Sequence, residues 1–208
     1  MSWKDHYVVF DTETTGFGPE AKIVEIALVE FRSGLKGATS IFSTLVNPGE
    51  IDWNHKDVLK ALEINGLSKE ALADAPLFED IVIEVFRMLS CPTWVAHNIK
   101  FDKRMIVNEV SRLPDHLMVT KFCPPIAMID VDTMLCDLGL NPGKKSRKLV
   151  DVAKRWKVDF SGAHRAVDDT MACARVLQKM MPLLTPVDEE FMKSHDVWAE
   201  KWHKLKGY

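Results

Sequence analysis

Long apolar runs, paired cysteines and tyrosines are scarce in this chain, and each shortage excludes a class of protein. No stretch approaches the ~20 apolar residues that a membrane-spanning helix needs, and strand-like residues already begin at Tyr7, which leaves no room for a signal peptide. The 4 cysteines are scattered and include no Cys-x-x-Cys pair, which argues against a zinc site and favours free thiols in a reducing compartment. We therefore expect a cytoplasmic protein without a membrane partner.

An excess of basic residues is also absent. The chain has 27 Lys and Arg against 30 Asp and Glu, a formal net charge of −3, whereas nucleic-acid-binding domains are typically basic. Four of the acids discussed below would, by binding two divalent cations, shift this net charge from −3 to about +1. The charge balance therefore neither supports nor excludes a nucleic-acid partner.

The residue pattern predicts a mixed five-stranded α/β sheet flanked by helices. Apolar and β-branched runs predict three consecutive strands at 7–11, 23–31 and 38–46, and two more at 93–97 and 126–131. Helical spacing predicts helices at 56–65, from 68 onward, and at 77–89, 101–113, 133–138, 148–156 and 165–181. Three strands in a meander followed by strands alternating with helices are typical of an α/β domain.

The end of the chain reads as an appendage to this domain. Residues 189–205 predict a strongly amphipathic last helix that carries two tryptophans on its apolar side. We expect residues 1–182 to form the domain, and residues 183–208 either to pack on it or to dock a partner such as a polymerase.

The first chemically informative segment is Phe-Asp-Thr-Glu-Thr-Thr-Gly at 10–16. In a strand, residues i and i+2 share a face, so Asp11 and Glu13 point the same way at the strand end. Two close carboxylates repel unless a cation lies between them, although a solvated turn is the alternative. The small residues of Thr14-Thr15-Gly16 suit close approach by a sugar or base.

The second segment is His-Asn-Ile-Lys-Phe-Asp at 97–102, which places Asp102 where a strand passes into a helix. Such an acid binds a metal or simply favours the positive end of the helix dipole, and both readings stay open. His97 is expected to be structural rather than a ligand, and Phe101 to pack in the core.

The third segment is His-Arg-Ala-Val-Asp-Asp at 164–169, and helical periodicity separates its two acids. Asp169 belongs to the apolar stripe of the predicted helix, whose other members are Ala172, Cys173, Val176, Leu177 and Met180. Asp168 groups with Arg175 and Lys179 on the solvent side. Because an ionised acid on a core-facing stripe is costly unless it is paired or bound to metal, we assign Asp169 the function and Asp168 the surface.

His164 precedes that helix, after Ser161-Gly162-Ala163, in a predicted loop. A lone loop histidine usually has no special role. Five residues before Asp169, however, an imidazole near a metal cluster is able to take a proton from an attacking water at neutral pH.

Together, the three segments closely resemble the motifs of the DEDDh exonucleases, the family that includes the proofreading (epsilon) subunit of DNA polymerase III. Asp11 and Glu13 match the family's Asp-x-Glu, Asp102 its Asn-x-x-Phe-Asp, and His164 with Asp169 its His-x4-Asp. The order and the spacings of roughly 90 and 60 residues match as well. A sister group has tyrosine in place of the histidine, but the tyrosines here, Tyr7 and Tyr208, lie far from Asp169 in sequence.

The resemblance implies a ribonuclease H-like fold and metal-dependent 3′-to-5′ hydrolysis of single-stranded or frayed DNA ends, releasing nucleoside 5′-monophosphates. It implies two Mg²⁺ or Mn²⁺ ions, with Asp11 on both, Glu13 and Asp169 completing one site and Asp102 supporting the other, and His164 as general base. Oxygen ligands also favour magnesium-type ions over zinc. Two alternatives stay open: RNA 3′-end trimming, since related ribonucleases share the same five residues, and a non-catalytic nucleic-acid or partner-binding module.

The same resemblance suggests residues that bind the terminal nucleotide. Ile64 and Asn65 lie where relatives often carry a His-Gly-Ile segment, with asparagine here in place of histidine. Thr14, Phe17 and Asn98 fall at positions that line the nucleotide pocket in relatives, although Phe17 also reads as a buried loop aromatic. The basic run Lys144–Lys148 is either a solvated loop or a contact to substrate phosphates.

Overall fold

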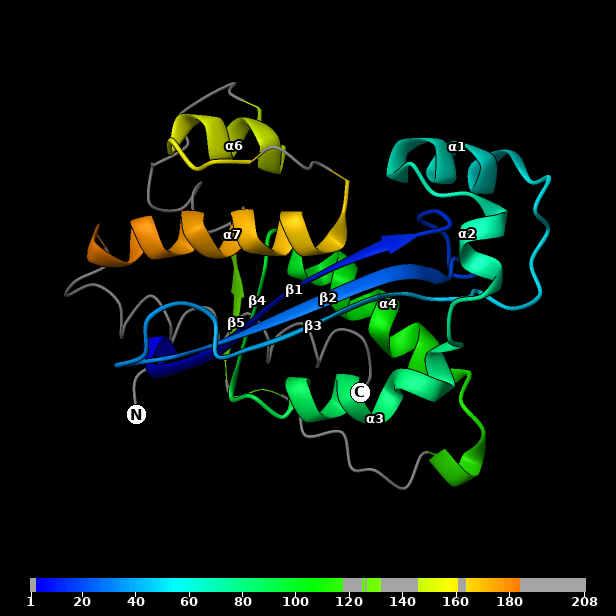
Figure 1. Cartoon of the computed structure of the whole chain (residues 1–208), viewed down its shortest axis with the longest axis horizontal. Coiled ribbons are helices and arrows are strands. Elements are labelled where there is room, and N and C mark those ends of the chain that lie inside the picture. Colours follow the sequence, from blue (N-terminus) through cyan, green and yellow to red (C-terminus); the bar gives the residue numbers. More distant parts are fainter. Residues whose placement is uncertain (1–2, 118–124, 126, 132–145, 161–163, 184–208) are drawn as a thin grey trace, which may run out of the picture.

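The fold is a mixed five-stranded sheet, as the sequence predicts, and its strands lie in the order β3-β2-β1-β4-β5 (Figure 1). The computed structural model describes residues 3–117, 125, 127–131, 146–160 and 164–183. β1 pairs antiparallel with β2 and β2 antiparallel with β3, whereas β1–β4 and β4–β5 are parallel. The strands are β1 (His6–Thr14), β2 (Ile23–Arg32), β3 (Ser40–Leu45), β4 (Thr93–Ala96) and β5 (Ala127–Asp130).

Two layers of helices cover this sheet (Figure 1). α3 (Phe78–Leu89) and α4 (Ile99–Ser111) pack on one face over a core that includes Phe10, Leu28 and Trp94. α6 (Leu149–Arg155) and α7 (Ala166–Met180) pack on the other face. α1 (Lys56–Asn65) and α2 (Lys69–Ala73) lie near the end of the sheet toward which β1 points. Short 3₁₀ turns at Trp3–Asp5, Asp115–Leu117 and Met181–Leu183 complete the described elements.

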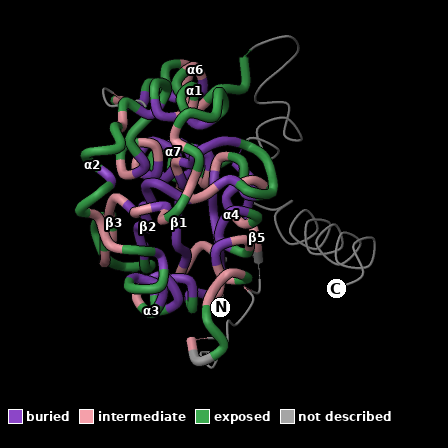
Figure 2. Tube along the Cα trace, turned by 90° about the vertical axis from the view of Figure 1, so that its right-hand side faces the viewer, coloured by how far each residue is buried: buried purple, intermediate pink, exposed green. Residues whose placement is uncertain are grey.

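Burial explains the strand sequences. β1 and β2 lie in the middle of the sheet with helices on both faces, so their residues are mostly buried (Figure 2). That position accounts for near-continuous apolar runs in place of strict alternation. β3, with one described neighbour, alternates between more and less exposed residues, as expected of an edge strand.

The helix boundaries follow local signals. Ser68 caps α2 by accepting a hydrogen bond from the Ala71 N–H at 3.2 Å, as serine commonly does at the start of a helix. α1 ends at Gly66, whose φ of 65° places it in the left-handed region that a glycine adopts without steric cost.

Some boundaries differ from those predicted. α4 begins at Ile99 rather than at residue 101, so Asp102 lies inside its first turn. β3 is shorter than the predicted 38–46, because turn and bend residues extend from 33 to 37 and pairing with β2 starts only at Ser40. The helix predicted at 133–138 and the last helix at 189–205 lie outside the described residues. Among the helices that the structure does describe, none is long and apolar enough to cross a membrane.

Candidate active site

The predicted catalytic residues meet at the end of β1, although they lie far apart in the sequence. Asp11 and Glu13 extend from β1 itself, Asp102 from the first turn of α4, and Asp169 from the first turn of α7. His164 lies just before α7 and is exposed. α4 and α7 cover opposite faces of the sheet, so β1 ends between the two helices that supply the other acids (Figure 1).

Asp102 is the most rigidly held of these acids. Its side chain is only 3% exposed, and its Oδ1 accepts hydrogen bonds from the Thr12 N–H at 3.0 Å and the Thr12 hydroxyl at 2.8 Å. Thr12 lies between Asp11 and Glu13 in β1, so the first and second motifs are joined directly. The helix-dipole role alone does not account for an acid held this way against a strand.

Glu13, His164 and Asp169 form a cluster that is able to hold a metal ion. One ligand atom from each lies within 4.8 Å of the others. The His164 N–H donates to Asp169 Oδ2 at 3.2 Å, which ties the loop to the helix start. The carboxylate oxygens of Glu13 and Asp169 are ligands that Mg²⁺ and Mn²⁺ prefer, so the two acids of this cluster, rather than the imidazole, fit the predicted type of cation.

The electrostatics of the acids indicate a shortage of positive charge. Burial and then the charges of Asp102, Asp169 and Glu13 raise the pKa of Asp11 well above its usual range. Burial, followed by repulsion from neighbouring acids, raises the pKa of Glu13 to about 8. The pKa values of Asp102 and Asp169 rise to about 7, chiefly through burial, although hydrogen bonds from Thr12 and His164 oppose the shift. Acids in such a group ionise together only beside a cation.

These pKa shifts predict that the metal-free protein loses stability as the pH rises. The folded state keeps protons on these acids up to pH values of about 7 to 8, whereas the unfolded chain releases them near 4. The free energy of unfolding therefore falls across that interval. We expect the melting temperature in EDTA to drop by ~5 °C or more between about pH 6 and about pH 9, and Mg²⁺ to remove most of the drop. An Asp169→Asn control should show a shallower slope, and a flat profile in EDTA would contradict the shifts.

Glu25 is a buried acid that the sequence reasoning did not assign. It faces Glu13 across the β1–β2 pair and is 1% exposed. Arg165, next to His164, forms an ion pair with it at 3.0 Å. The available signal was an acid within the apolar run 23–31, but its partner is 140 residues away and no local pattern points to it.

Phe17, one of the predicted nucleotide-binding residues, is strongly exposed. Its side chain is 79% exposed, so the alternative of a buried loop aromatic is wrong. The ring lies 5.6 Å from that of Phe101, which packs against the core, and Arg104 donates to the Phe17 carbonyl at 3.2 Å. Asn98, at the start of α4, is also exposed.

Thr14, Ile64 and Asn65 have different surroundings. The Thr14 side chain is buried and donates to the Gly16 carbonyl at 2.8 Å. Asn65 is 6% exposed and its amide donates to the Thr14 carbonyl at 3.2 Å, so α1 braces the end of β1. Ile64 is 47% exposed. The Asn65 amide therefore hydrogen-bonds the backbone of β1 next to the acids and does not point into solvent.

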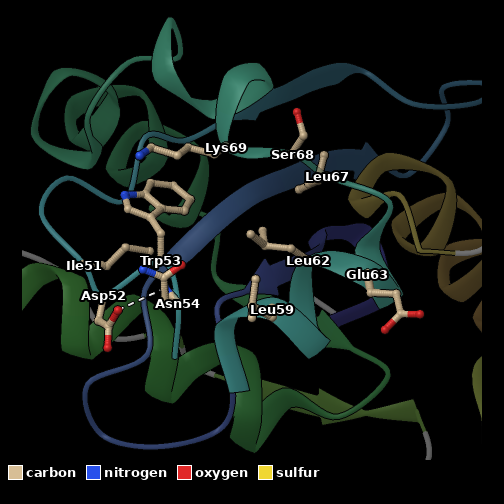
Figure 3. A pocket seen from close by; sticks show the side chains of 10 residues that line it. All are labelled: Ile51, Asp52, Trp53, Asn54, Leu59, Leu62, Glu63, Leu67, Ser68 and Lys69. Atoms are coloured by element: carbon tan, nitrogen blue, oxygen red, sulfur yellow. Dashed lines mark hydrogen bonds between the residues drawn. The ribbon is translucent and has the colours of Figure 1, made fainter. Parts of the chain in front are cut away.

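Two further features are separate from the acid cluster. A cavity of about 620 Å³ opens between the 51–54 loop and α1 and α2, where Lys69 lies 5.4 Å from the Trp53 ring (Figure 3). None of the clustered acids lines it.

Of the basic run, residues 146–148 are described and exposed, and the Arg147 carbonyl lies 2.7 Å from His97 Nε2. That contact agrees with the structural role expected of His97.

Comparisons with known proteins agree with this geometry. The sequence profile of the RNase_T family, described as exonuclease, matches residues 8–177. The epsilon subunit of DNA polymerase III from Treponema pallidum (strain Nichols) is 31% identical over 178 residues, which cover 84% of this chain and 76% of that protein. A PolC-type DNA polymerase III from Bacillus subtilis (strain 168) is 28% identical over 207 residues, 99% of this chain. The chain spans only 13% of that polymerase.

Solved structures share the fold. Exonuclease I of E. coli in complex with a dT13 oligonucleotide superimposes with a TM-score of 0.68 at 18% identity, over 90% of this chain and 42% of that one. The nuclease domain of 3′hExo, a DEDDh family member bound to rAMP, superimposes with a TM-score of 0.64 at 19% identity, over 86% of this chain and 92% of that one. The fold is thus ribonuclease H-like, and on the profile match the chain belongs to the RNase_T family of exonucleases.

Proposed function

We propose that this chain is a metal-dependent 3′-to-5′ exonuclease that removes nucleoside 5′-monophosphates from single-stranded or frayed DNA ends. The observation that carries the proposal is the meeting of Asp11, Glu13, Asp102, Asp169 and His164 at the end of β1. A non-catalytic module has no need for five such groups in one place, with pKa shifts that call for cations.

The residues divide the chemistry among them. Asp11, Glu13 and Asp169 would hold one divalent cation, and Asp11 with support from Asp102 a second. When bound, two such ions activate water and stabilise the leaving 3′-oxygen. His164, exposed beside Glu13 and Asp169, accepts a proton from the attacking water. The exposed ring of Phe17 supplies a face on which a terminal base stacks. Asn98 and Ile64 border the same end of the sheet. Asn65 holds Thr14 in place through its hydrogen bond to the Thr14 carbonyl.

DNA is the favoured substrate because two relatives with more than 30% identity are named as subunits of a DNA polymerase. The relatives from Treponema pallidum and Rickettsia prowazekii, 31% and 32% identical, are both named DNA polymerase III subunit epsilon. RNA is the second candidate, since a structural neighbour of the same fold is bound to rAMP. We also propose that the protein works beside a polymerase in the cytoplasm. Residues 183–208, which lie outside the 8–177 family match, would be the segment that docks the polymerase or packs on the domain.

A gel time course tests this function. DNA and RNA of one sequence, labelled at the 5′ end, are incubated with the protein in Mg²⁺, in Mn²⁺ and in EDTA. We expect a ladder that shortens from the 3′ end, requires metal and forms faster on DNA. Faster shortening of RNA would move the assignment to RNA trimming. A folded protein that binds either strand without shortening it would support the binding-module alternative.

A further inference from the structure

Glu25 is a buried acid whose partners all belong to the start of α7. Arg165 Nε donates to both of its oxygens, at 3.1 and 3.3 Å, and Arg165 Nη2 donates to Oε1 at 3.0 Å. The Ala166 N–H donates to Oε2 at 3.3 Å. An acid only 1% exposed is tolerated in a sheet when its charge is matched in this way.

The Ala166 contact gives Glu25 the role of a helix cap. Arg165 is the N-cap residue of α7, and Ala166 is the first helical residue with an N–H that lacks an intrahelical partner. A carboxylate from β2 satisfies this N–H and lies at the positive end of the helix dipole. The start of α7 is therefore held against the sheet at the strand position that faces Glu13.

His164 lies between two anchors. On one side its own N–H is bonded to Asp169, and on the other its neighbour Arg165 is bonded to Glu25. Its φ of 69° is left-handed, which a non-glycine residue adopts only where surrounding contacts enforce it. The position of the imidazole relative to Glu13 and Asp169 thus depends on where residue 165 is fixed.

We propose that Glu25 and Arg165 form a positioning pair that places the His164 imidazole for proton transfer, without touching the reacting atoms themselves. This inference rests on the proposed function, because it takes His164 as the general base. It differs from a charge effect on the metal site. Positioning predicts that loss of either member lowers kcat, whereas a charge effect predicts that the two losses shift the Mg²⁺ requirement in opposite directions.

The first test compares Arg165→Ala, Arg165→Lys and Glu25→Gln with the parent protein. We expect kcat to fall ~10–100-fold in Arg165→Ala, with KM and the Mg²⁺ concentration at half-maximal rate within about twofold of the parent. Arg165→Lys should recover part of the rate, because lysine keeps the positive charge opposite Glu25. The recovery should be incomplete, because an ammonium group lacks the planar, two-point contact of the guanidinium.

Arg165→Ala leaves the buried carboxylate of Glu25 without its cation and is the variant most at risk of misfolding, whereas Arg165→Lys keeps a cation and Glu25→Gln leaves only an exposed guanidinium. The melting temperature of each variant is therefore measured first, and a reduced kcat in well-folded Arg165→Lys or Glu25→Gln supports the positioning role where Arg165→Ala does not fold.

A charge effect would look different. Arg165→Ala leaves a negative charge beside the acids and Glu25→Gln leaves a positive one, so the Mg²⁺ requirement would fall in the first and rise in the second. Opposite shifts of that kind, or a parent-like kcat in Arg165→Ala, would overturn the positioning role.

The same strand supplies matched controls. Glu30 is also a buried acid of β2, and it pairs with Arg32, whose side chain is likewise 54% exposed. Glu30 faces Val8, near the opposite end of β1 from Glu13. Glu30→Gln and Arg32→Ala should keep kcat within about twofold of the parent while losing a comparable ion pair.

A double-mutant cycle then isolates the route through His164. If the pair acts by placing the imidazole, Arg165→Ala should change kcat by less than about twofold in a His164→Ala background. A full additional loss in that background would overturn the inference. A parent protein that fails to shorten any strand would count against the proposed function instead, before the variants are compared.

Discussion

Asp169→Asn will reduce the exonuclease rate by ~1000-fold or more while leaving the fold intact. Asparagine keeps the size of the side chain and an oxygen that accepts the His164 N–H, so the loop anchor survives and the carboxylate charge is lost. Losing a charged metal ligand costs several kcal/mol of transition-state stabilisation, and ~1.4 kcal/mol corresponds to tenfold in rate. The measurement is single-turnover cleavage of 5′-labelled DNA, with the melting temperature as a check on folding.

The neighbouring acid is a stringent control for this result. Asp168→Asn makes the same change one residue earlier in α7, at an exposed position. Its rate should stay within about threefold of the parent, because a solvated charge contributes little. Equal losses in both variants would mean that helix-terminal charge matters rather than metal ligation, and Asp169 would then lose its assigned role. Asp11→Ala should match Asp169→Asn.

His164→Ala should lower kcat by ~10²–10⁴-fold, the usual contribution of a general base. The half-saturating Mg²⁺ concentration should change little, and added imidazole should restore part of the rate by entering the space left by the side chain. A large rise in the Mg²⁺ requirement without rescue would mean instead that His164 is a metal ligand, which its distance of within 4.8 Å from Glu13 and Asp169 also permits. His6→Ala, at the far end of β1 beside Glu30, is the control.

The parts of the fold and site that the sequence predicts are those set by local periodicity. Asp169 was separable from Asp168 because a helix repeats every 3.6 residues, and the structure leaves Asp168 exposed and Asp169 partly buried. The five strands and the mixed sheet were also predictable, because each strand is a short apolar run bounded by turn residues or by a helical pattern; the order of the strands in the sheet is a finding of the structure.

The parts that it did not predict depend on contacts between distant segments. Glu25 lies in a strand that is buried along nearly its whole length, and nothing near it in sequence indicates Arg165. The hydrogen bond from the Asn65 amide to the Thr14 carbonyl, 51 residues earlier, has no local signal either, and the nucleotide contact of Asn65 stays a prediction. The exposure of Phe17 is set by how its loop lies against α4, which periodicity does not report.

The raised pKa values of the acids at the end of β1 change the meaning of the net charge. A count of −3 assumes that every carboxyl is ionised, but Glu13, with a pKa of about 8, holds a proton at neutral pH when no metal is present. Binding cations would therefore displace protons into the buffer, and the metal-free protein is less acidic than its composition suggests. The protons bound to these acids already reduce the negative charge that a nucleic-acid strand would meet at the site. When metal ions bind, they replace those protons as the source of positive charge.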